Sequence, residues 1–598
     1  MTVAHALNVL ETGGLIHLAA VHPELEYAFR HALVQEAAYL TLVKSHRREV
    51  HKAVGESLEQ LYSAELASPV LAPVLARHFD EGGDPARALN YYILAGRAAQ
   101  DRYAIGEAIH HFSRALVIAK SQASTGEVVA DLFLRRGRAL ELNAQDAAAL
   151  ENYEEMERWS AEHADRRARL AAMTARATIY VRPSVQGNLA RGYELSQQAL
   201  ALARELGDRP AEAKVLWNLL QHEIATGNIQ DALAYGEQAL EIARADGLRE
   251  QVAYVLTDLW KVYAMNGQSG RAQAAVVEAQ GLWRELGALN MLADNLASTA
   301  FVQAVAGNYQ QAVALSEEAE QVSRSIGNVW NQSYALYIVN LVHFDRGDIG
   351  RAIAITDECA RLAEQAGFAE GLVQSGFARS LMYAYLGALP QAFAAARELQ
   401  ARVQVGVAYA DSARLAEAML LLLLILDGRQ AEAQSALDSF HFAHKQEALQ
   451  EQFILLHMVV NRCLVELALV DGDAEQALEL AEGLIAHFQR EGTRLFFPDA
   501  LWLRGRALAA AGRPGDAQSA FEVAHAEADA LGSRRMLWLI LAELAGLAEM
   551  RGEQPAAREL RRQAAEHIAY IADHAGAAEL RESFLNRADV RAALAQAA

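Results

Sequence analysis

The sequence predicts an all-α solenoid built from a repeated pair of helices, and two observations carry that prediction. The first is composition: 53% of the 598 residues are apolar, 7% are aromatic and only 10 are prolines, as is typical of alanine- and leucine-rich helices. The second is a fixed period, because glycines recur every 40 residues along most of the chain. A chain of this length exceeds a single globular core, and such a period indicates a helical-repeat array.

The glycines form two series, and each series marks one turn per repeat. The first lies in segments such as TGNIQDA and AGNYQQA, at intervals of 40 and later of 41, 44, 40 and 40: Gly187, Gly227, Gly267, Gly307, Gly347, Gly387, Gly428, Gly472, Gly512 and Gly552. The second lies about halfway between: Gly207, Gly247, Gly287, Gly327, Gly367, Gly492 and Gly532. Glycine ends helices in the left-handed conformation, and a following Asp or Asn can cap the next helix. Each period therefore predicts two helices of roughly 16 residues, about 24 Å long. With weaker turns near Tyr103 and Ala144, the array has about twelve helix pairs.

Small residues follow the turn glycines at fixed distances. Alanine stands five positions after most of them: Ala232, Ala272, Ala312, Ala352, Ala392, Ala477, Ala517 and Ala557. A second alanine often follows seven residues later: Ala239, Ala279, Ala319, Ala524 and Ala564. Because seven residues make nearly two helical turns, both alanines lie on one face and let the paired helix approach closely. HEAT-like repeats also have a period near 40 and are the alternative architecture, but the recurring glycine turn and paired alanines argue against them.

This turn-plus-alanine pattern resembles the tetratricopeptide repeat, whose usual period is about 34. Longer helices account for the difference, and such long repeats resemble the helical-repeat sensor domain of maltose-type transcription activators. The resemblance implies a right-handed α-α superhelical solenoid of tetratricopeptide-like helix pairs over 126–598, preceded by linking helices and a degenerate first repeat over 63–125. We expect each repeat to touch only its neighbours, so that a bound ligand shifts the curvature through small adjustments at many interfaces.

Residues 1–62 have a different character. The segment GGLIHLAAVHPELEYAF predicts two short extended stretches around a turn, followed by helices near 31–43 and 46–62. The run YAFRHALVQEAAYLTLVKSHRREVHKAVGESLE resembles the junction at which a winged-helix module follows the nucleotide-binding domain of STAND-class (AAA-type) signalling ATPases. LARHFDEGGDPARALNYYILAGRAA, EAIHHFSRAL and LRESFLNRADVRAAL extend the resemblance over nearly the whole chain. It implies that 1–62 is a partial winged-helix-like junction and that YAFRHALVQEAAY is a coupling hinge.

Charge, cysteine content and hydropathy exclude several classes of partner. The formal charge of −21 repels phosphates, so we expect no nucleic-acid binding by this chain, and the Arg47–Arg48 cluster is too small to reverse that. His31, His46 and His51 do not have metal-ligand spacing. The most apolar run, MLLLLLIL, is less than half the length of a membrane span. The two cysteines offer neither a disulfide framework nor a metal knuckle, and we expect a cytoplasmic protein without membrane contact.

Motifs for catalysis are missing from the sequence. It contains no GxxxxGK[ST], GxGxxG, HExxH or GxSxG, and the P-loop and acidic metal-binding strand of the ATPases that it resembles are absent. We therefore expect no catalytic residues, no cofactor and no ATP turnover. DGDAEQALELAE matches acidic positions 1, 3, 5 and 12 of a calcium loop, but Gln476 replaces the required glycine. We interpret it as another repeat turn.

The resemblance also implies a binding surface. In tetratricopeptide arrays the first helix of each pair lines the concave face, with exposed positions 13, 10 and 6 residues before the turn glycine. Those rows predict a surface for a protein, a peptide or a small-molecule effector, rich in the aromatic and arginine side chains that anchor interfaces. It comprises Lys214, Trp217, Gln221, Tyr254, Lys261, Asp294, Phe301, Tyr334, Tyr337, Gln374, Phe377, Arg462, Glu466, Asp499, Trp502 and Arg506. The alternative is that several of these aromatic residues simply pack between repeats.

Three functions are compatible with these patterns. The leading hypothesis is a non-catalytic sensor and scaffold arm of a STAND-type signal-transduction ATPase or transcription regulator, working with a nucleotide-binding module in cis or in trans. The second is a freestanding tetratricopeptide adaptor that assembles protein partners. The third is an enzyme that uses carboxylates inside the solenoid, although no sequence motif indicates it.

Overall fold

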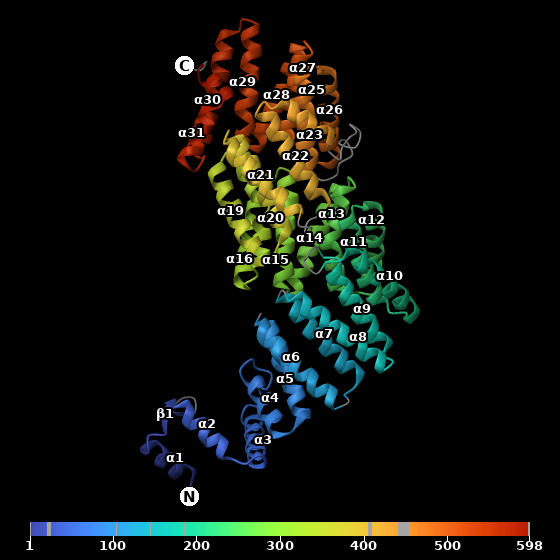
Figure 1. Cartoon of the computed structure of the whole chain (residues 1–598), viewed down its shortest axis with the longest axis vertical. Helices are drawn as coiled ribbons and strands as arrows, with labels where there is room; N and C mark the ends of the chain where they lie inside the picture. Colours follow the sequence, from blue (N-terminus) through green and yellow to red (C-terminus); the bar gives the residue numbers. More distant parts are fainter. Residues whose placement is uncertain are drawn as a thin grey trace. The chain divides into compact units, whose positions relative to one another are not determined.

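The computed structural model describes residues 2–20, 25–102, 104–122, 124–143, 145–182, 187–404, 410–439 and 454–595. Over these residues the chain is helical apart from one two-stranded sheet, which confirms the predicted all-α class (Figure 1). Tyr103 and Ala144, near which weaker turns were predicted, lie outside the described residues. The chain divides into two compact units, Met1–Ala172 and Met173–Ala598, and the boundary falls within α9 (Arg166–Tyr180).

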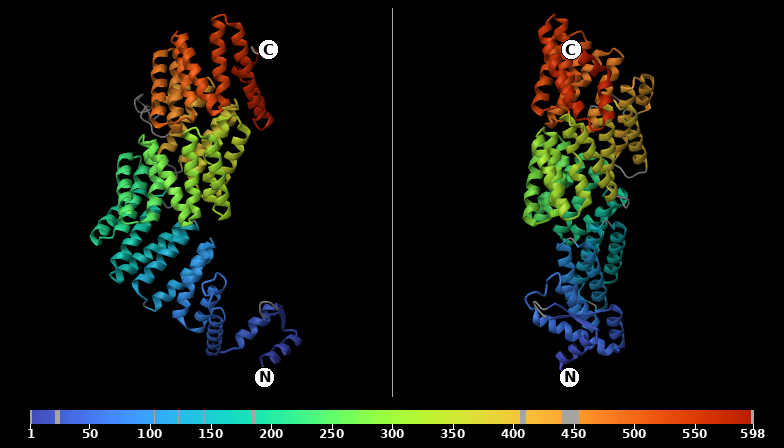
Figure 2. Two further views of the ribbon diagram at one scale, coloured as in Figure 1. Left: turned by 180° about the vertical axis from the view of Figure 1, so that it is seen from behind. Right: turned by 90° about the vertical axis from the view of Figure 1, so that its left-hand side faces the viewer.

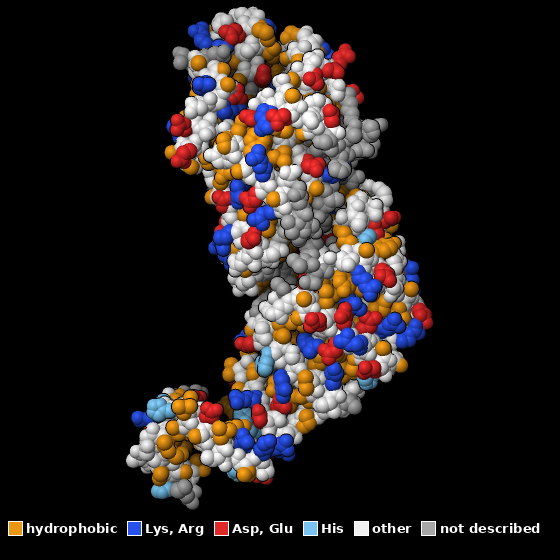
Figure 3. Space-filling view, viewed as in Figure 1, with side chains coloured by type: hydrophobic (Ala, Val, Ile, Leu, Met, Phe, Trp, Pro, Cys, Tyr) orange, Lys and Arg blue, Asp and Glu red, His pale blue; other side chains and the backbone are white. Residues whose placement is uncertain are grey.

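Unit 1 begins with a small lobe that buries very little. Its elements are α1 (Val3–Thr12), β1 (Ile16–Ala20), β2 (Glu26–Phe29) and α2 (Ala32–Thr41). The strands pair antiparallel, which confirms the two predicted extended stretches. Among the described residues of the lobe, Ile16 alone is buried, while Val3, Leu33 and Leu40 are largely exposed, and Figure 3 shows hydrophobic atoms at its surface.

The rest of unit 1 is a run of helices that pack against their neighbours in sequence. They are α3 (Lys44–Leu61), α4 (Leu71–Gly82), α5 (Pro85–Asp101), α6 (Ile105–Ser121), α7 (Gly126–Leu142) and α8 (Asp146–Glu162). The helices predicted near 31–43 and 46–62 are thus confirmed as α2 and α3. Fully buried aromatic rings, those of Phe79, Phe112 and Phe133, fill the spaces between successive helices.

Unit 2 contains the regular repeats, and each repeat is an A helix followed by a B helix. The A helices are α9, α11 (Arg209–Thr226), α13 (Arg249–Met265), α15 (Leu289–Val305), α17 (Val329–Leu336) with α18 (Val339–Asp345), α20 (Ala369–Tyr385), α22 (Ala410–Leu426), α25 (Ile454–Val470), α27 (Phe497–Ala510) and α29 (Arg534–Met550). The B helices are α10 (Leu189–Leu206), α12 (Ile229–Ala245), α14 (Ser269–Leu286), α16 (Tyr309–Ser325), α19 (Ile349–Ala366), α21 (Leu389–Gln404), α23 (Gln430–Ser439), α26 (Ala474–Glu491), α28 (Pro514–Leu531) and α30 (Gln554–Asp573). Two short helices, α31 (Ala578–Asn586) and α32 (Ala588–Ala595), follow.

The turn chemistry follows the sequence prediction. Gly307 between α15 and α16 has φ 82, and Gly327 after α16 has φ 66, both in the left-handed region that glycine adopts without a steric penalty. Ala312 and Ala319, five and twelve residues after Gly307, are fully buried where α16 packs against α15. The chain is therefore a solenoid of tetratricopeptide-like helix pairs with a period of about 40.

Unit 2 departs from the prediction that repeats touch only their neighbours. The N–H groups of Arg494 and Leu495 both donate to the carbonyl oxygen of Val305, at 2.8 and 3.1 Å, and the N–H of Gly350 donates to the carbonyl oxygen of His574 at 2.7 Å. The turns that follow α15, α18 and α20 thus lie against α26–α32, as Figures 1 and 2 show for the yellow-green and red helices. We call this line of contacts the seam. The expectation of neighbour-only contacts is wrong here, because the array curves far enough within unit 2 to meet itself.

No helix in the described part of the chain is long and apolar enough to cross a bilayer.

Candidate functional site

The sixteen residues of the predicted binding surface all come from A helices or from the break within one of them. They lie on α11 (Lys214, Trp217, Gln221), α13 (Tyr254, Lys261), α15 (Asp294, Phe301), α17 and the residue after it (Tyr334, Tyr337), α20 (Gln374, Phe377), α25 (Arg462, Glu466) and α27 (Asp499, Trp502, Arg506). The structure gathers them into two groups, apart from Gln374 and Phe377 on α20. We call the surface of α11, α13, α15 and α17 the inner face.

A carboxylate that the sequence analysis missed organises the inner face. Asp258 of α13 accepts hydrogen bonds from Trp217 Nε1 at 2.9 Å and from Gln221 Nε2 at 2.6 Å. Lys261 Nζ lies 3.7 Å from its other oxygen. Burial raises the pKa of Asp258, and Lys261 and the Trp217 bond oppose the rise. The available signal was an acid at a buried position of VLTDLWKV, one residue beside the predicted row.

A lysine and two aromatic rings stand beside this carboxylate. Lys214 Nζ lies 3.8 Å from the ring centroid of Trp217 and 4.8 Å from that of Tyr254. The two rings are 5.6 Å apart and tilted by 55°. An ammonium group against two ring faces is a cation–π arrangement, so these residues of neighbouring repeats form one continuous polar and aromatic surface.

Asp294 is the unpaired carboxylate of the inner face. Among the described residues, none forms a hydrogen bond or an ion pair with it, although Lys261 lies within electrostatic range. Burial raises its pKa to about 7, and Lys261 opposes the rise. The pKa of Tyr334, whose hydroxyl lies 3.1 Å from Ser298 Oγ, is also raised by burial. A half-buried carboxylate with a pKa near neutral pH and no partner is a group to which a ligand can supply a hydrogen bond or an opposite charge.

Aromatic rings continue the inner face toward α17. The ring of Phe301 lies 5.9 Å from that of Trp260 and 6.1 Å from that of Tyr337, and Tyr334 lies 5.7 Å from Tyr337. These residues come from three successive A helices, so one row of rings crosses three repeats. Trp260 is buried, whereas Phe301, Tyr334 and Tyr337 are partly exposed.

The second group lies on α25 and α27. Arg506 Nη1 donates to Glu466 Oε1 at 2.6 Å, and its guanidinium lies 4.7 Å from the ring centroid of Trp502. Burial raises the pKa of Glu543 on α29, where Arg506 lowers it and Glu466 raises it. Two buried nitrogens of this group, Arg462 Nε and Trp502 Nε1, have no hydrogen-bond partner among the described residues.

Three of the predicted residues are buried rather than on a binding surface, and we correct them. Phe377 is 0% exposed because it packs in the core between repeats, and Asp499 is 3% exposed because it pairs with Arg535 in the seam. Gln374 is also buried and donates to Glu370. Trp217 and Trp502 expose 8% each, so they present an edge rather than a face.

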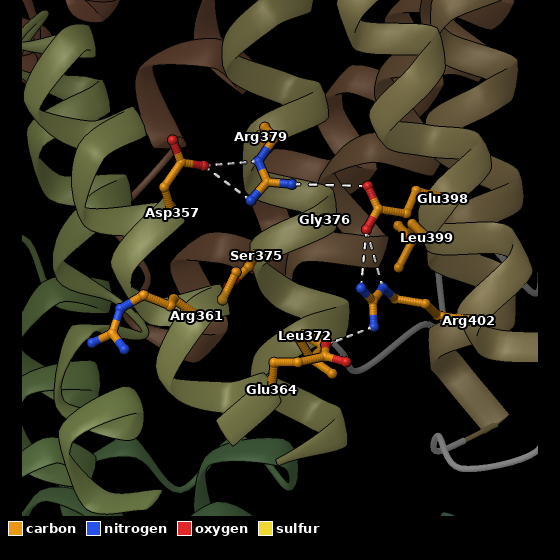
Figure 4. Close-up of a pocket in the computed structure, with 11 residues that line it drawn as sticks. Asp357, Arg361, Glu364, Leu372, Ser375, Gly376, Arg379, Glu398, Leu399 and Arg402 are labelled. Atoms are coloured by element: carbon orange, nitrogen blue, oxygen red, sulfur yellow. Dashed lines mark hydrogen bonds and ion pairs between the residues drawn. The ribbon is translucent and has the colours of Figure 1, made fainter. Parts of the chain in front are cut away.

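A pocket of about 310 Å³ opens on the B-helix side, between α19, α20 and α21. Figure 4 shows that Asp357, Arg379, Glu398, Arg402 and Glu364 are joined in a row, whereas Arg361 is not joined to them. Arg379 bridges Asp357 and Glu398, at 2.9 and 4.0 Å, and Arg402 bridges Glu398 and Glu364, at 3.1 and 3.0 Å. Because each of these side chains is already paired with an opposite charge, the inner face is the better candidate.

Two other polar residues that the sequence offers as possible ligands, Asp473 and His343, have structural roles. Asp473, from the calcium-like segment, accepts from the N–H of Gln476 at 2.9 Å and so caps α26. His343 is buried four residues before its turn glycine, and burial lowers its pKa to about 4. Across the described part of the chain, no three His, Cys, Asp or Glu side chains are placed to hold a metal ion.

Comparison with known proteins supports the repeat class. A family profile described as tetratricopeptide repeat matches residues 169–245, which run from α9 to α12. The chain is 27% identical over 129 residues to an uncharacterized protein of Rhizobium meliloti (strain 1021), which is 21% of this chain and 12% of that protein. The match thus spans a small part of that relative.

Three solved structures are similar to this chain in part, at low sequence identity. A signal transduction ATPase with numerous domains (STAND) from Pyrococcus horikoshii, with a tetratricopeptide repeat sensor, is 16% identical with a TM-score of 0.40, covering 63% of this chain and about half (54%) of that one. A Rap protein complexed with competence and sporulation factor is 13% identical with a TM-score of 0.42, covering 66% and 99%. Yeast Tom70 is 14% identical with a TM-score of 0.30, covering 79% and 96%.

Proposed function

We propose that this chain is a non-catalytic, protein- or peptide-binding solenoid that serves as the sensor and scaffold arm of a STAND-type signal-transduction ATPase or transcription regulator. The observation that carries the binding role is the inner face, where Asp294 lacks a partner among the described residues and lies within electrostatic range of Lys261 and Tyr334. Helical-repeat arrays commonly use such extended curved surfaces to hold a polypeptide. Aromatic rings with adjacent charges are the groups that anchor protein interfaces.

The lobe at the start of unit 1 supports the sensor-arm part of the proposal. Apolar side chains on two of its helices, Val9, Leu33 and Leu40, are exposed over more than half of their area. A lobe with one buried side chain among its described residues gains little stability from its own core. A nucleotide-binding module docked on it would bury this surface and receive the signal through α2 and α3.

Partner capture followed by titration tests the binding role. The full chain is used to capture partners, which are identified by mass spectrometry and then titrated in purified form against variants. Trp217→Ala and Tyr334→Ala each reduce affinity at least tenfold, because they remove inner-face anchors. Tyr193→Ala, which removes an exposed ring on the B helix α10, leaves affinity unchanged. Wild-type affinity in both folded inner-face variants would refute the binding site.

Charged substitutions in the lobe test the docking of a nucleotide-binding module. Leu33→Asp and Leu40→Asp place carboxylates on side chains that are 78% and 63% exposed, so the fold is retained. We expect them to abolish co-purification of a P-loop protein while inner-face binding persists. Undiminished co-purification, or ATP turnover by the homogeneous chain itself, would contradict the proposed role.

A further inference from the structure

The seam of unit 2 is held by a buried cluster of charges. Arg535 of α29 donates to Asp499 of α27 through two nitrogens, at 2.7 and 2.6 Å, and to Asp345 of α18 at 2.8 Å. Arg535 is 2% exposed, Asp345 0% and Asp499 3%. Asp345 also accepts from Ser533 Oγ and from Tyr309 Oη, each at 2.8 Å. We call this cluster the latch; it joins residues 190 positions apart.

Tyr385 and Trp538 continue the latch along the seam. Tyr385 Oη donates to the carbonyl oxygen of Arg535 at 3.1 Å and accepts from Trp538 Nε1 at 2.7 Å. Its ring stacks 5.9 Å from that of Phe584. On the other side of the latch, Phe496 has φ 63, which is strained for an aromatic residue, directly after the cross-seam amide of Leu495. A seam of discrete buried contacts has closed and open arrangements rather than a continuum of intermediates.

The A helix that carries Asp345 is interrupted in its middle. It consists of α17 and α18, separated at Tyr337 and Ile338, where the Tyr337 N–H bonds to Tyr334 three residues back. Among the described A helices of unit 2 it is the one that is broken, and no proline or glycine lies in VWNQSYALYIVNLVHFD. A local tightening of this kind without a helix-breaking residue often marks a hinge.

The two halves of this helix belong to different surfaces. Tyr334 on α17 and Tyr337 at the break belong to the inner face, while Asp345 at the end of α18 belongs to the latch. We propose that α17–α18 is a lever through which occupancy of the inner face and closure of the seam control each other. The regulatory part rests on the proposed binding function; the mechanical link between Tyr337 and the seam does not.

Binding at the inner face and closure of the latch would be coupled by thermodynamic linkage. A ligand that contacts Tyr334 and Tyr337 differently in the two forms of the helix shifts the latch by its difference in affinity. Opening the latch breaks the hydrogen bonds of Asp345 with Ser533 and Arg535, so the closed form is the resting state without a ligand. By reciprocity, closing or opening the latch changes inner-face affinity by the same factor by which the ligand shifts the latch.

Hydrogen exchange in the ligand-free chain tests the link directly. The reporters are the cross-seam amides of Gly350, Arg494 and Leu495. Arg535→Ala accelerates their exchange at least tenfold, while amides inside α13 and α29 keep wild-type rates. The matched control is Arg561→Ala, which removes a buried arginine, 8% exposed, that pairs with Glu549 within one repeat, and it leaves the reporters unchanged.

The lever itself is tested from the inner face. Tyr337→Ala accelerates exchange of the Gly350 amide at least threefold, whereas Tyr254→Ala, a half-buried ring on the unbroken α13, does not. Equal effects of the two tyrosine variants, or reporter exchange unchanged by Arg535→Ala, would overturn the proposal. If Arg535→Ala does not fold, Asp499→Asn replaces it with the same expectations. These outcomes need no ligand, so a failure here leaves the binding experiment above to judge the proposed function separately.

Discussion

A carboxylate of the seam, Asp345, and a carboxylate of the inner face, Asp294, differ in the number of their hydrogen-bond partners. Asp345 in the seam accepts hydrogen bonds from Ser533, Arg535 and Tyr309, whereas Asp294 on the inner face has no partner among the described residues and a pKa of about 7. A buried charge that is fully paired fixes geometry, and an unpaired one costs stability. The difference separates a region that holds the array together from a region that remains available for a partner.

Three glycines that occupy the same position in their repeats also distinguish the seam from the rest of the array. Gly270, Gly350 and Gly515 each stand three residues after a turn glycine, in the first turn of a B helix. A Cβ at Gly350 would lie 2.6 Å from the backbone nitrogen of Gly576 across the seam. At Gly270 and Gly515 nothing lies within 4 Å of that position. Only the seam, and not the repeat itself, requires glycine here.

The largest expected effect in this comparison belongs to Gly350→Ala. The added methyl group meets backbone that cannot rotate away, so we expect it to destabilise unit 2 by about 3 kcal/mol. Gly515→Ala, in a helix with free space, is expected to stabilise by about 0.5–1 kcal/mol because alanine favours helix and restricts the unfolded chain. Guanidinium denaturation of the full chain, followed by circular dichroism, measures both.

Comparing the two variants separates the effect of the seam contacts on stability from the effect of helix propensity. Equal stabilities of the two alanine variants would mean that the seam opens at little cost around Gly350. The latch would then contribute less to the free energy of unfolding of unit 2 than its burial indicates. Gly270→Ala serves as a second control, since Gly270 lies in α14 with the same free space.

The sequence predicted the repeat far better than it predicted the seam. The turn glycines and buried alanines depend on contacts within about 20 residues, which a period reveals. The latch joins residues 190 positions apart, and its position depends on small rotations summed over about five repeats. The sequence does carry traces of it: the interval lengthens to 44 before Gly472, and GTRLFFPDA replaces the regular helix start before α27.

The inner face was predicted in part for a similar reason. Rows counted back from the turn glycine place Tyr254, Lys261 and Asp294 on partly exposed positions of the A helices. The same rows also selected Asp499, because counting along one helix cannot know that another part of the array covers it. Asp258 was missed because it is directed toward the Trp217 of the preceding repeat from a neighbouring row.

A smaller effect than that of Gly350→Ala is expected for Asp294→Asn, and its size depends on pH. Because burial raises the pKa of Asp294 to about 7, the folded chain holds a proton that the unfolded chain has lost above about pH 4. Stability from this residue is therefore present at low pH and declines as pH rises toward 7. Asparagine keeps the shape without the charge, so the variant is more stable than wild type, and the gap grows by about 1–2 kcal/mol between pH 5 and pH 8.

Thermal melting of the two proteins at pH 5 and pH 8 measures that gap, with Asp516→Asn, which replaces an exposed carboxylate paired with Arg513, as the surface control. A gap that is constant with pH would show that Asp294 is ionised and solvated like a surface acid, and the inner face would then lose the unpaired carboxylate on which its binding role rests. If the gap grows as expected, a partner that carries an ammonium or guanidinium group to Asp294 binds more tightly at pH 8 than at pH 5, because it supplies the charge that the repeat array leaves uncompensated.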